Sequence, residues 1–133
     1  MCLDKLNRKI TIKSGVGFKV FSIRKNKLYN SNWVETGRPF KINVWVDELD
    51  YRVKPLPRGR LEAYGFFYRA GFHTFTDFAG ANNYLRIYTK YCELNEVLVI
   101  YKVQFKNVVA QGIQDHHDIV VAKNIKLLEK VNL

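Results

Sequence analysis

The sequence predicts an α+β fold, a mostly antiparallel β-sheet with one short helix packed on a face. Three observations support this prediction. Short segments that alternate apolar and polar residues recur along the chain and dominate its C-terminal third, as strands do. Glycine, asparagine and proline interrupt these segments at short intervals, as turn residues do. Only one stretch, 76–88, has apolar residues at helical spacing.

The first expected strands lie near the N-terminus. Ile10–Ile12 alternates as a strand does, and Phe18–Ile23 resumes the alternation after a break. The break, at 14–17, contains two glycines. We therefore expect two short strands joined by a glycine turn.

Phe40–Val46 is the next expected strand. Its alternation places Ile42, Val44 and Val46 on one face. Trp45 then points to the other face, where it could cover a partner or a second layer.

A basic loop is expected at about 52–60. Pro55 and Pro57 remove backbone donors and fix φ, so this stretch cannot be a central strand. Loops of this kind often carry binding residues. A short strand at Glu62–Phe67 would then lead toward the expected helix.

The helix is expected to begin near Thr76, a candidate N-cap, with Asp77 favourable against the helix dipole. Gly80 and two asparagines lower its intrinsic propensity, so packing must hold it. The residues at helical spacing are Phe78, Ala81, Leu85 and Tyr88.

The C-terminal third is expected to form three strands. Val97–Phe105 begins as an apolar run and then alternates, as a central strand does on emerging to solvent. Asn107–Ile113 and Asp118–Leu128 follow. His116 and His117 between them offer ligands for a metal, but adjacent histidines on a turn usually point apart, and we expect a polar hairpin turn.

Composition indicates one domain, 1–133. With 133 residues and 47% apolar side chains, the chain can bury one core and is too short for two independent ones. The aromatic content of 14% and the lack of low-complexity stretches argue against disorder outside loops.

The net charge of +10 is unevenly distributed. Residues 1–27 carry eight basic side chains against Asp4, and residues 51–60 carry four with no acid. If the two segments meet in space, they form a positive face that would attract nucleic acid, a nucleotide or another polyanion. The alternative is a solvated basic surface that maintains solubility.

Several function classes lack their sequence signals. No apolar run approaches the ~18 residues that span a bilayer, and Met1–Lys5 lacks the apolar core of a secretory signal. We expect a cytoplasmic protein with no membrane partner, in which Cys2 and Cys92 stay reduced. Neither cysteine has CxxC spacing, and the three histidines complete no zinc pattern, so we expect no metal and no cofactor.

The motif YRAGFHTFTDF, at 68–78, is the strongest candidate for a binding site. His73 follows a glycine and precedes the expected helix start, where backbone N–H groups can receive an anion. Arg69 and Tyr68 could hold a phosphate and stack a base. The competing interpretation makes Gly71 a turn and His73 a structural residue. The predicted ligand-binding residues are Tyr68, Arg69 and His73, with Lys54, Arg58 and Arg60 from the basic loop.

A catalytic function has little support in the sequence. Catalysis needs a nucleophile with a base, or two carboxylates in one cleft, and no such pattern is convincing here. Cys2 would become an N-terminal thiol nucleophile if Met1 were removed. We expect a protein that is not an enzyme.

A series of short motifs occurs in order along nearly the whole chain. They are the start Met1–Leu3, then Gly17–Phe21, Lys27–Tyr29, Ala70–Phe75, the apolar strand through Val103, and Ile119–Lys123. The series resembles a group of small bacteriophage and prophage proteins that begin MCL and carry a GFHxF element before a helix. The resemblance brings no catalytic residues, and it implies a phage context in which accessory proteins blunt host defence.

The leading hypothesis is therefore a phage anti-defence protein that sequesters an anionic host ligand, a nucleotide immune signal, in the host cytosol. The resemblance implies a homo-oligomer with basic pockets at its interfaces. One alternative is a nucleic-acid-binding module without sequence specificity, since no helix-turn-helix, zinc-finger or RNP pattern occurs. Another is an inhibitor that binds an acidic surface of a host defence protein.

Overall fold

The computed structural model describes residues 3–30, 38–51, 60–63, 66–69, 71–92 and 95–132. It confirms the predicted fold class, because the chain is mostly antiparallel sheet with one short helix beside it. The strands are β1 (Lys5–Leu6), β2 (Gly15–Arg24), β3 (Lys27–Asn30), β4 (Trp45–Asp47), β5 (Arg60–Ala63), β6 (Phe66–Arg69), β7 (Phe72–Phe75), β8 (Val97–Gln114) and β9 (His117–Lys130). The helices are a single turn α1 (Glu48–Tyr51), α2 (Phe78–Tyr88) and a 3₁₀ turn, η2 (Thr89–Tyr91).

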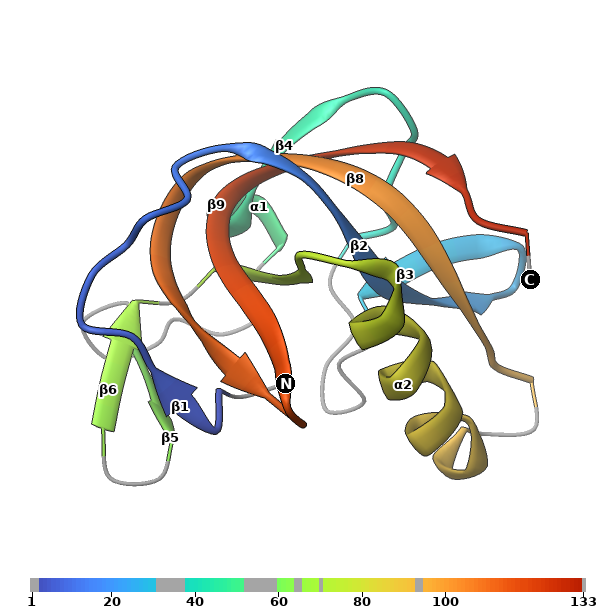
Figure 1. Cartoon of the computed structure of the whole chain (residues 1–133). Coiled ribbons are helices and arrows are strands. Elements are labelled where there is room, and N and C mark those ends of the chain that lie inside the picture. The colour runs from blue at the N-terminus through green and yellow to red at the C-terminus, as the bar shows by residue number, and fades with distance from the viewer. Residues whose placement is uncertain are drawn as a thin grey trace.

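The main sheet has seven strands. Its hydrogen-bonded order is β1-β8-β2-β7-β9-β4, with β3 added on β2, and β8 also pairs with β9. The pairings β8–β2, β2–β7, β7–β9 and β9–β8 therefore form a closed cycle, made possible because β8 and β9 arch across the molecule (Figure 1). β5 and β6 form a separate two-stranded hairpin.

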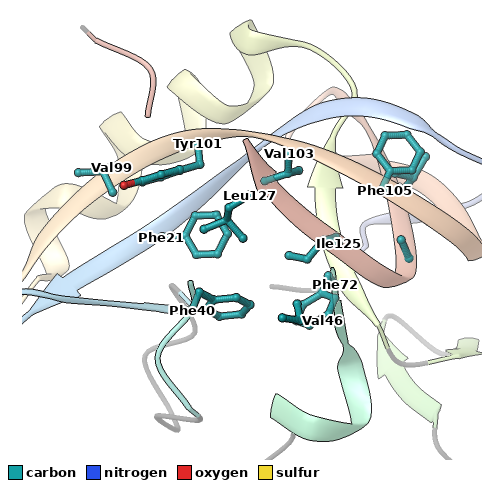
Figure 2. Close-up of a cluster of buried hydrophobic side chains, with 12 residues drawn as sticks. Phe21, Phe40, Val46, Phe72, Val99, Tyr101, Val103, Phe105, Ile125 and Leu127 are labelled. Atoms are coloured by element: carbon teal, nitrogen blue, oxygen red, sulfur yellow. The ribbon is translucent and has the colours of Figure 1, made fainter. Parts of the chain in front are cut away.

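Two apolar clusters lie on opposite faces of the sheet because side chains alternate along each strand. The first cluster is drawn in Figure 2 and includes Phe21, Phe40, Val46, Phe72, Val99, Tyr101, Val103, Phe105, Ile125 and Leu127. The second is covered by α2 and includes Leu3, Val20, Tyr68, Phe75, Ala81, Tyr84, Ile100, Ile119 and Val121. Consecutive residues such as Val20 and Phe21 thus belong to different clusters.

The glycine turn predicted at 14–17 is wrong. Gly15 and Gly17 lie inside β2, paired along their length with β8. A Cβ on Gly17 would lie 2.5 Å from the carbonyl oxygen of Phe75, so the glycine permits a close approach of two strands.

Two further strand predictions are also wrong. Ile10–Ile12 forms no strand, because the backbone N–H groups of Thr11 and Ile12 donate to the side-chain oxygen of Gln111 instead of a neighbouring strand. Glu62–Phe67 is not one strand, since β5 ends at Ala63 and β6 begins at Phe66.

Phe40–Val46 is not one strand either, because Asn43 adopts a left-handed φ of 62° and only Trp45 and Val46 of this stretch belong to β4. The prediction that Ile42, Val44 and Val46 share one face is also wrong, because Ile42 and Val44 are exposed and Val46 is buried.

The C-terminal strands are longer than predicted. β8 runs without interruption through Asn107, which has a left-handed φ of 57°, and its register with β9 shifts just after it, between Val108 and Ala110. Asp115 and His116 form the predicted hairpin turn to β9, and both have positive φ, as a two-residue turn between twisted strands requires.

The helix begins one residue later than predicted. Asp77 is the N-cap, and its carboxylate accepts a hydrogen bond of 2.9 Å from the Gly80 N–H. Thr76 cannot serve because its N–H donates to the carbonyl of Asp118, which keeps it on the sheet. Phe78 is partly exposed, and the buried face is centred on Ala81 and Tyr84.

Candidate anion-binding site

The hairpin β5–β6 and strand β7 position the residues of the YRAGFHTFTDF motif. Strand alternation sends Tyr68 and Arg69 to opposite sides of β6. Tyr68 is 4% exposed and belongs to the second apolar cluster, whereas Arg69 is exposed. His73, in the middle of β7, is 6% exposed. The structure therefore separates the three motif residues, with two inside and one outside.

Tyr68 and His73 are hydrogen-bonded to each other. The Tyr68 hydroxyl lies 2.8 Å from Nε2 of His73 and accepts a hydrogen bond of 3.1 Å from the Leu3 N–H. Burial lowers the pKa of His73 well below its ordinary value, and the charge of Lys19 acts in the same direction, while a hydrogen bond to the Gly71 backbone opposes them. Burial and the neighbouring lysine therefore both disfavour the charged form of the His73 ring.

Lys19 completes this group of buried polar residues. It is 2% exposed, and its Nζ donates a hydrogen bond of 2.9 Å to the carbonyl oxygen of His73. Its Nζ lies over the Phe21 ring, 5.9 Å from the ring centroid. Burial lowers its pKa from 10.5 to about 7. We call Leu3, Lys19, Tyr68 and His73 the interior polar chain.

The interior polar chain is a joint between elements rather than an open site. It ties the N-terminal segment to β6, β6 to β7, and β2 to β7. A base could stack on Tyr68 only by displacing the packing around it. The geometry therefore favours the interpretation in which His73 is structural.

Of the three predicted ligand residues of the motif, Arg69 is the one that faces solvent. In the hairpin, Arg69 is directly opposite Arg60 in register. The register thus places the backbone positions of two basic residues side by side in the hairpin. Lys54 and Arg58, the other predicted ligand residues, lie outside the described residues.

The basic N-terminal segment reaches the same hairpin. The bond from Leu3 to Tyr68 anchors it there, and β1 lies at the same end of the molecule as β5 and β6 (Figure 1). Lys5 in β1 is exposed, as are Arg8 and Lys9 after it. Leu3 of the basic N-terminal segment therefore lies beside the hairpin that carries Arg60.

Two features were not predicted from the sequence. Lys19 was counted only as a surface charge, although apolar residues flank it on both sides, which is a signal of burial. Lys106 and Lys126 contact Trp45 with their ammonium groups. Trp45 was correctly predicted to point away from the buried Val46, but the lysines come from strands whose pairing the sequence does not reveal.

Other chemistry is sparse in the described part of the chain. No cluster of three or more histidine, cysteine or acidic residues that could hold a metal occurs among the described residues. His116 is exposed in the β8–β9 turn. Cys92 is a free thiol whose pKa is raised by burial and by Glu96, which disfavours the nucleophilic thiolate. Within the residues described, no helix is long and apolar enough to cross a membrane.

Comparisons with known proteins do not assign this chain to a family. The chain matches no protein-family model, no curated protein and no solved structure. The resemblance to phage proteins therefore stays a prediction, and the function has to be argued from the residues themselves.

Proposed function

We propose that this protein is a non-catalytic binding protein that captures an anionic ligand, a nucleotide, at the solvent side of the β5–β6 hairpin. The observation that carries the proposal is the register that sets Arg60 opposite Arg69. Like charges at directly opposed positions destabilise an antiparallel pair. A phosphate group bound by the exposed Arg69 would offset this unfavourable pairing, because a guanidinium group matches phosphate oxygens with paired N–H donors.

The surroundings of the hairpin support the proposal. Exposed Lys5 lies on β1 at the same end of the molecule, so the local field favours negative charge. Behind the hairpin, the hydrogen bonds of Tyr68 fix β6 against β7. Arg69 is thus presented on a braced strand, which limits the ordering that a ligand would have to impose.

The biological setting in this proposal comes from the resemblance alone. The nucleotide would be an immune signal of the host, and the protein would act as a phage anti-defence factor in the host cytosol. Sequestration would need affinity for the nucleotide and no turnover of it.

Native mass spectrometry is the experiment that tests this function. The purified protein is incubated with a mixture of cyclic dinucleotides, and any bound molecule is released by heat and identified. We expect an intact nucleotide to be recovered, and the same spectrum gives the number of subunits. Recovery of a cleaved nucleotide would contradict the non-catalytic proposal.

Arg69→Ala and Arg86→Ala form the matched pair of variants. Both arginines are exposed, but Arg86 lies on α2. We expect Arg69→Ala to weaken nucleotide binding at least about tenfold, as loss of a charged hydrogen-bonding group does, with no change in melting temperature. Arg86→Ala should bind as the wild type does. Equal affinities for the two variants would remove the hairpin from the site.

A further inference from the structure

A second basic surface lies where β4 joins the sheet, away from the β5–β6 hairpin (Figure 1). Here two lysines contact one tryptophan: Nζ of Lys106 is 4.1 Å from the ring centroid of Trp45, and Nζ of Lys126 is 5.2 Å from it. All three side chains are half-buried, so part of the ring is open to solvent. We call these three residues, with Gln104, the lysine–tryptophan face.

Strand alternation places these residues on one side of the sheet. In β8, Gln104 and Lys106 alternate with Val103 and Phe105, which point into the first apolar cluster (Figure 2). Lys102 continues the row but is directly opposite Glu129, so its charge is partly balanced. Lys106, opposite the uncharged Asn124, therefore contributes more net positive charge to this row than Lys102 does.

The pairing of β4, β9 and β8 extends this row across neighbouring strands. Lys126 of β9 is opposite Trp45 on one side and Gln104 on the other. Trp45, Lys126 and Gln104 thus form a continuous line of half-buried side chains across β4, β9 and β8. Asp47 at the edge accepts hydrogen bonds from the Leu49 N–H and the Asn124 amide and keeps its negative charge, so the two lysines exceed the acidic charge of this region by one.

A rival explanation is that the lysines and the indole simply stabilise each other. A cation on an exposed indole shifts an equilibrium by about two- to fivefold. Stacking of a nucleic-acid base on an aromatic side chain shifts binding by about five- to 150-fold. A base can therefore displace a lysine from the ring, and the displaced ammonium group, on its flexible stem, can contact a phosphate.

We propose that the lysine–tryptophan face binds single-stranded nucleic acid, with one base stacked on Trp45 and flanking phosphates held by Lys106 and Lys126. Single strands fit because an indole on a sheet surface can stack only with a base that is unpaired and accessible. Gln104 offers an amide to the base or the sugar without selecting one sequence. This site is independent of the nucleotide proposed at the hairpin.

Fluorescence anisotropy with a labelled oligothymidylate of about fifteen nucleotides tests the proposal. We expect the wild type to bind, Trp45→Ala to bind at least about tenfold more weakly, and Trp45→Phe to retain most of the affinity. Lys106→Gln and Lys126→Gln should each reduce the slope of log affinity against log salt by about 0.7, because each lysine releases one phosphate counterion.

Lys90 and Tyr91 supply a matched control. Lys90 Nζ lies 5.2 Å from the Tyr91 ring centroid, the same distance as Lys126 from Trp45, but on the 3₁₀ turn after α2. Lys90→Gln and Tyr91→Ala should leave oligothymidylate binding and its salt slope unchanged. This pair separates a specific surface from a general effect of removing a lysine or an aromatic ring.

Four outcomes would overturn the proposal. Trp45→Ala could bind as tightly as the wild type, or the Lys90 and Tyr91 variants could lose as much affinity as the Trp45 variant. A duplex of the same length could bind more tightly than the single strand. Finally, an oligoglutamate peptide could bind in a Trp45-dependent way while oligothymidylate does not, which would assign the face to an acidic protein partner.

Discussion

A lysine beside an aromatic ring occurs twice in this molecule, once inside it at Lys19 and Phe21 and once on its surface at Lys106 and Trp45. The ammonium group lies 5.9 Å from the ring centroid in the first pair and 4.1 Å in the second. Lys19 is 2% exposed, and a backbone carbonyl accepts its hydrogen bond, whereas Lys106 is half-buried and water can reach it. The environment, and not the residue type, therefore decides what each lysine can do.

The two lysines differ in how much hydration they lose on folding. An interior lysine has lost its hydration, so its charge opposes folding and its partners cannot be exchanged without opening the core. A surface lysine on an indole keeps most of its hydration and can exchange the ring for a phosphate at small cost. Changes in the interior should therefore appear mainly in stability, and changes on the lysine–tryptophan face mainly in binding.

The largest effect is expected for Phe72→Ala. Phe72 is 3% exposed in the first apolar cluster and packs against Phe40 at a ring-centroid distance of 5.8 Å. Removing the ring should lower the free energy of unfolding by about 3–5 kcal/mol, measured by chemical denaturation. Val16→Ala is the control, since Val16 is 47% exposed and should change stability little.

Tyr68→Phe should give the next largest effect. The hydroxyl accepts from the Leu3 N–H and bonds Nε2 of His73, so its removal leaves two buried groups without this partner. We expect a loss of about 2–3 kcal/mol in unfolding free energy. Tyr91→Phe, at a tyrosine that is 69% exposed, should cost almost nothing. A cost equally small at Tyr68 would mean that the interior polar chain is not a joint.

Features of the fold that depend on local sequence signals could be predicted, and those that depend on distant residues could not. The fold class, the single helix and the turn between β8 and β9 could be predicted because alternation, helical spacing and turn residues are local signals. Gly17 was misassigned to a turn because its role depends on the Phe75 carbonyl, a residue far along the chain. Asn43 broke a predicted strand by adopting a left-handed φ, which its sequence neighbours do not require.

The candidate sites could not be predicted in full from the sequence, because strand pairing decides which of their residues become neighbours. Tyr68, Arg69 and His73 are close in sequence, but one hairpin and one strand divide them between interior and surface. Arg60 and Arg69 become neighbours only through the β5–β6 register. The lysines at Trp45 come from β8 and β9, so that cluster could not be predicted before the strand order was known.

A pH dependence should distinguish the two lysines. The folded pKa of Lys19 is about 7 and its ordinary value 10.5, so between these values the unfolded chain binds more protons than the folded one. Stability from this group therefore rises with pH through that window and is lost as pH falls toward 7. We expect the free energy of unfolding to rise by about 2 kcal/mol from pH 7 to 9 on this account.

Lys19→Met isolates this contribution. Methionine retains the length of the stem without a titrating group, so the variant should lack the rise that the wild type shows over the same pH range. Lys106→Met should keep the rise, because Lys106 is only half-buried. Denaturation curves at pH 7, 8 and 9 for the three proteins make the comparison. Parallel profiles for the wild type and Lys19→Met would show that the lysine is hydrated in the folded state.

The smallest effect on stability is expected at the lysine–tryptophan face itself. Lys106→Gln and Lys126→Gln each remove one cation from a ring that water can reach, so each should lower the free energy of unfolding by less than about 1 kcal/mol. The proposed binding surface requires this small value, because a lysine that contributed strongly to folding could not leave the ring for a phosphate. If either variant proved as destabilised as Tyr68→Phe, Trp45 and its two lysines would be part of the structural framework. These surface lysines would then contribute to folding as strongly as the interior polar chain does.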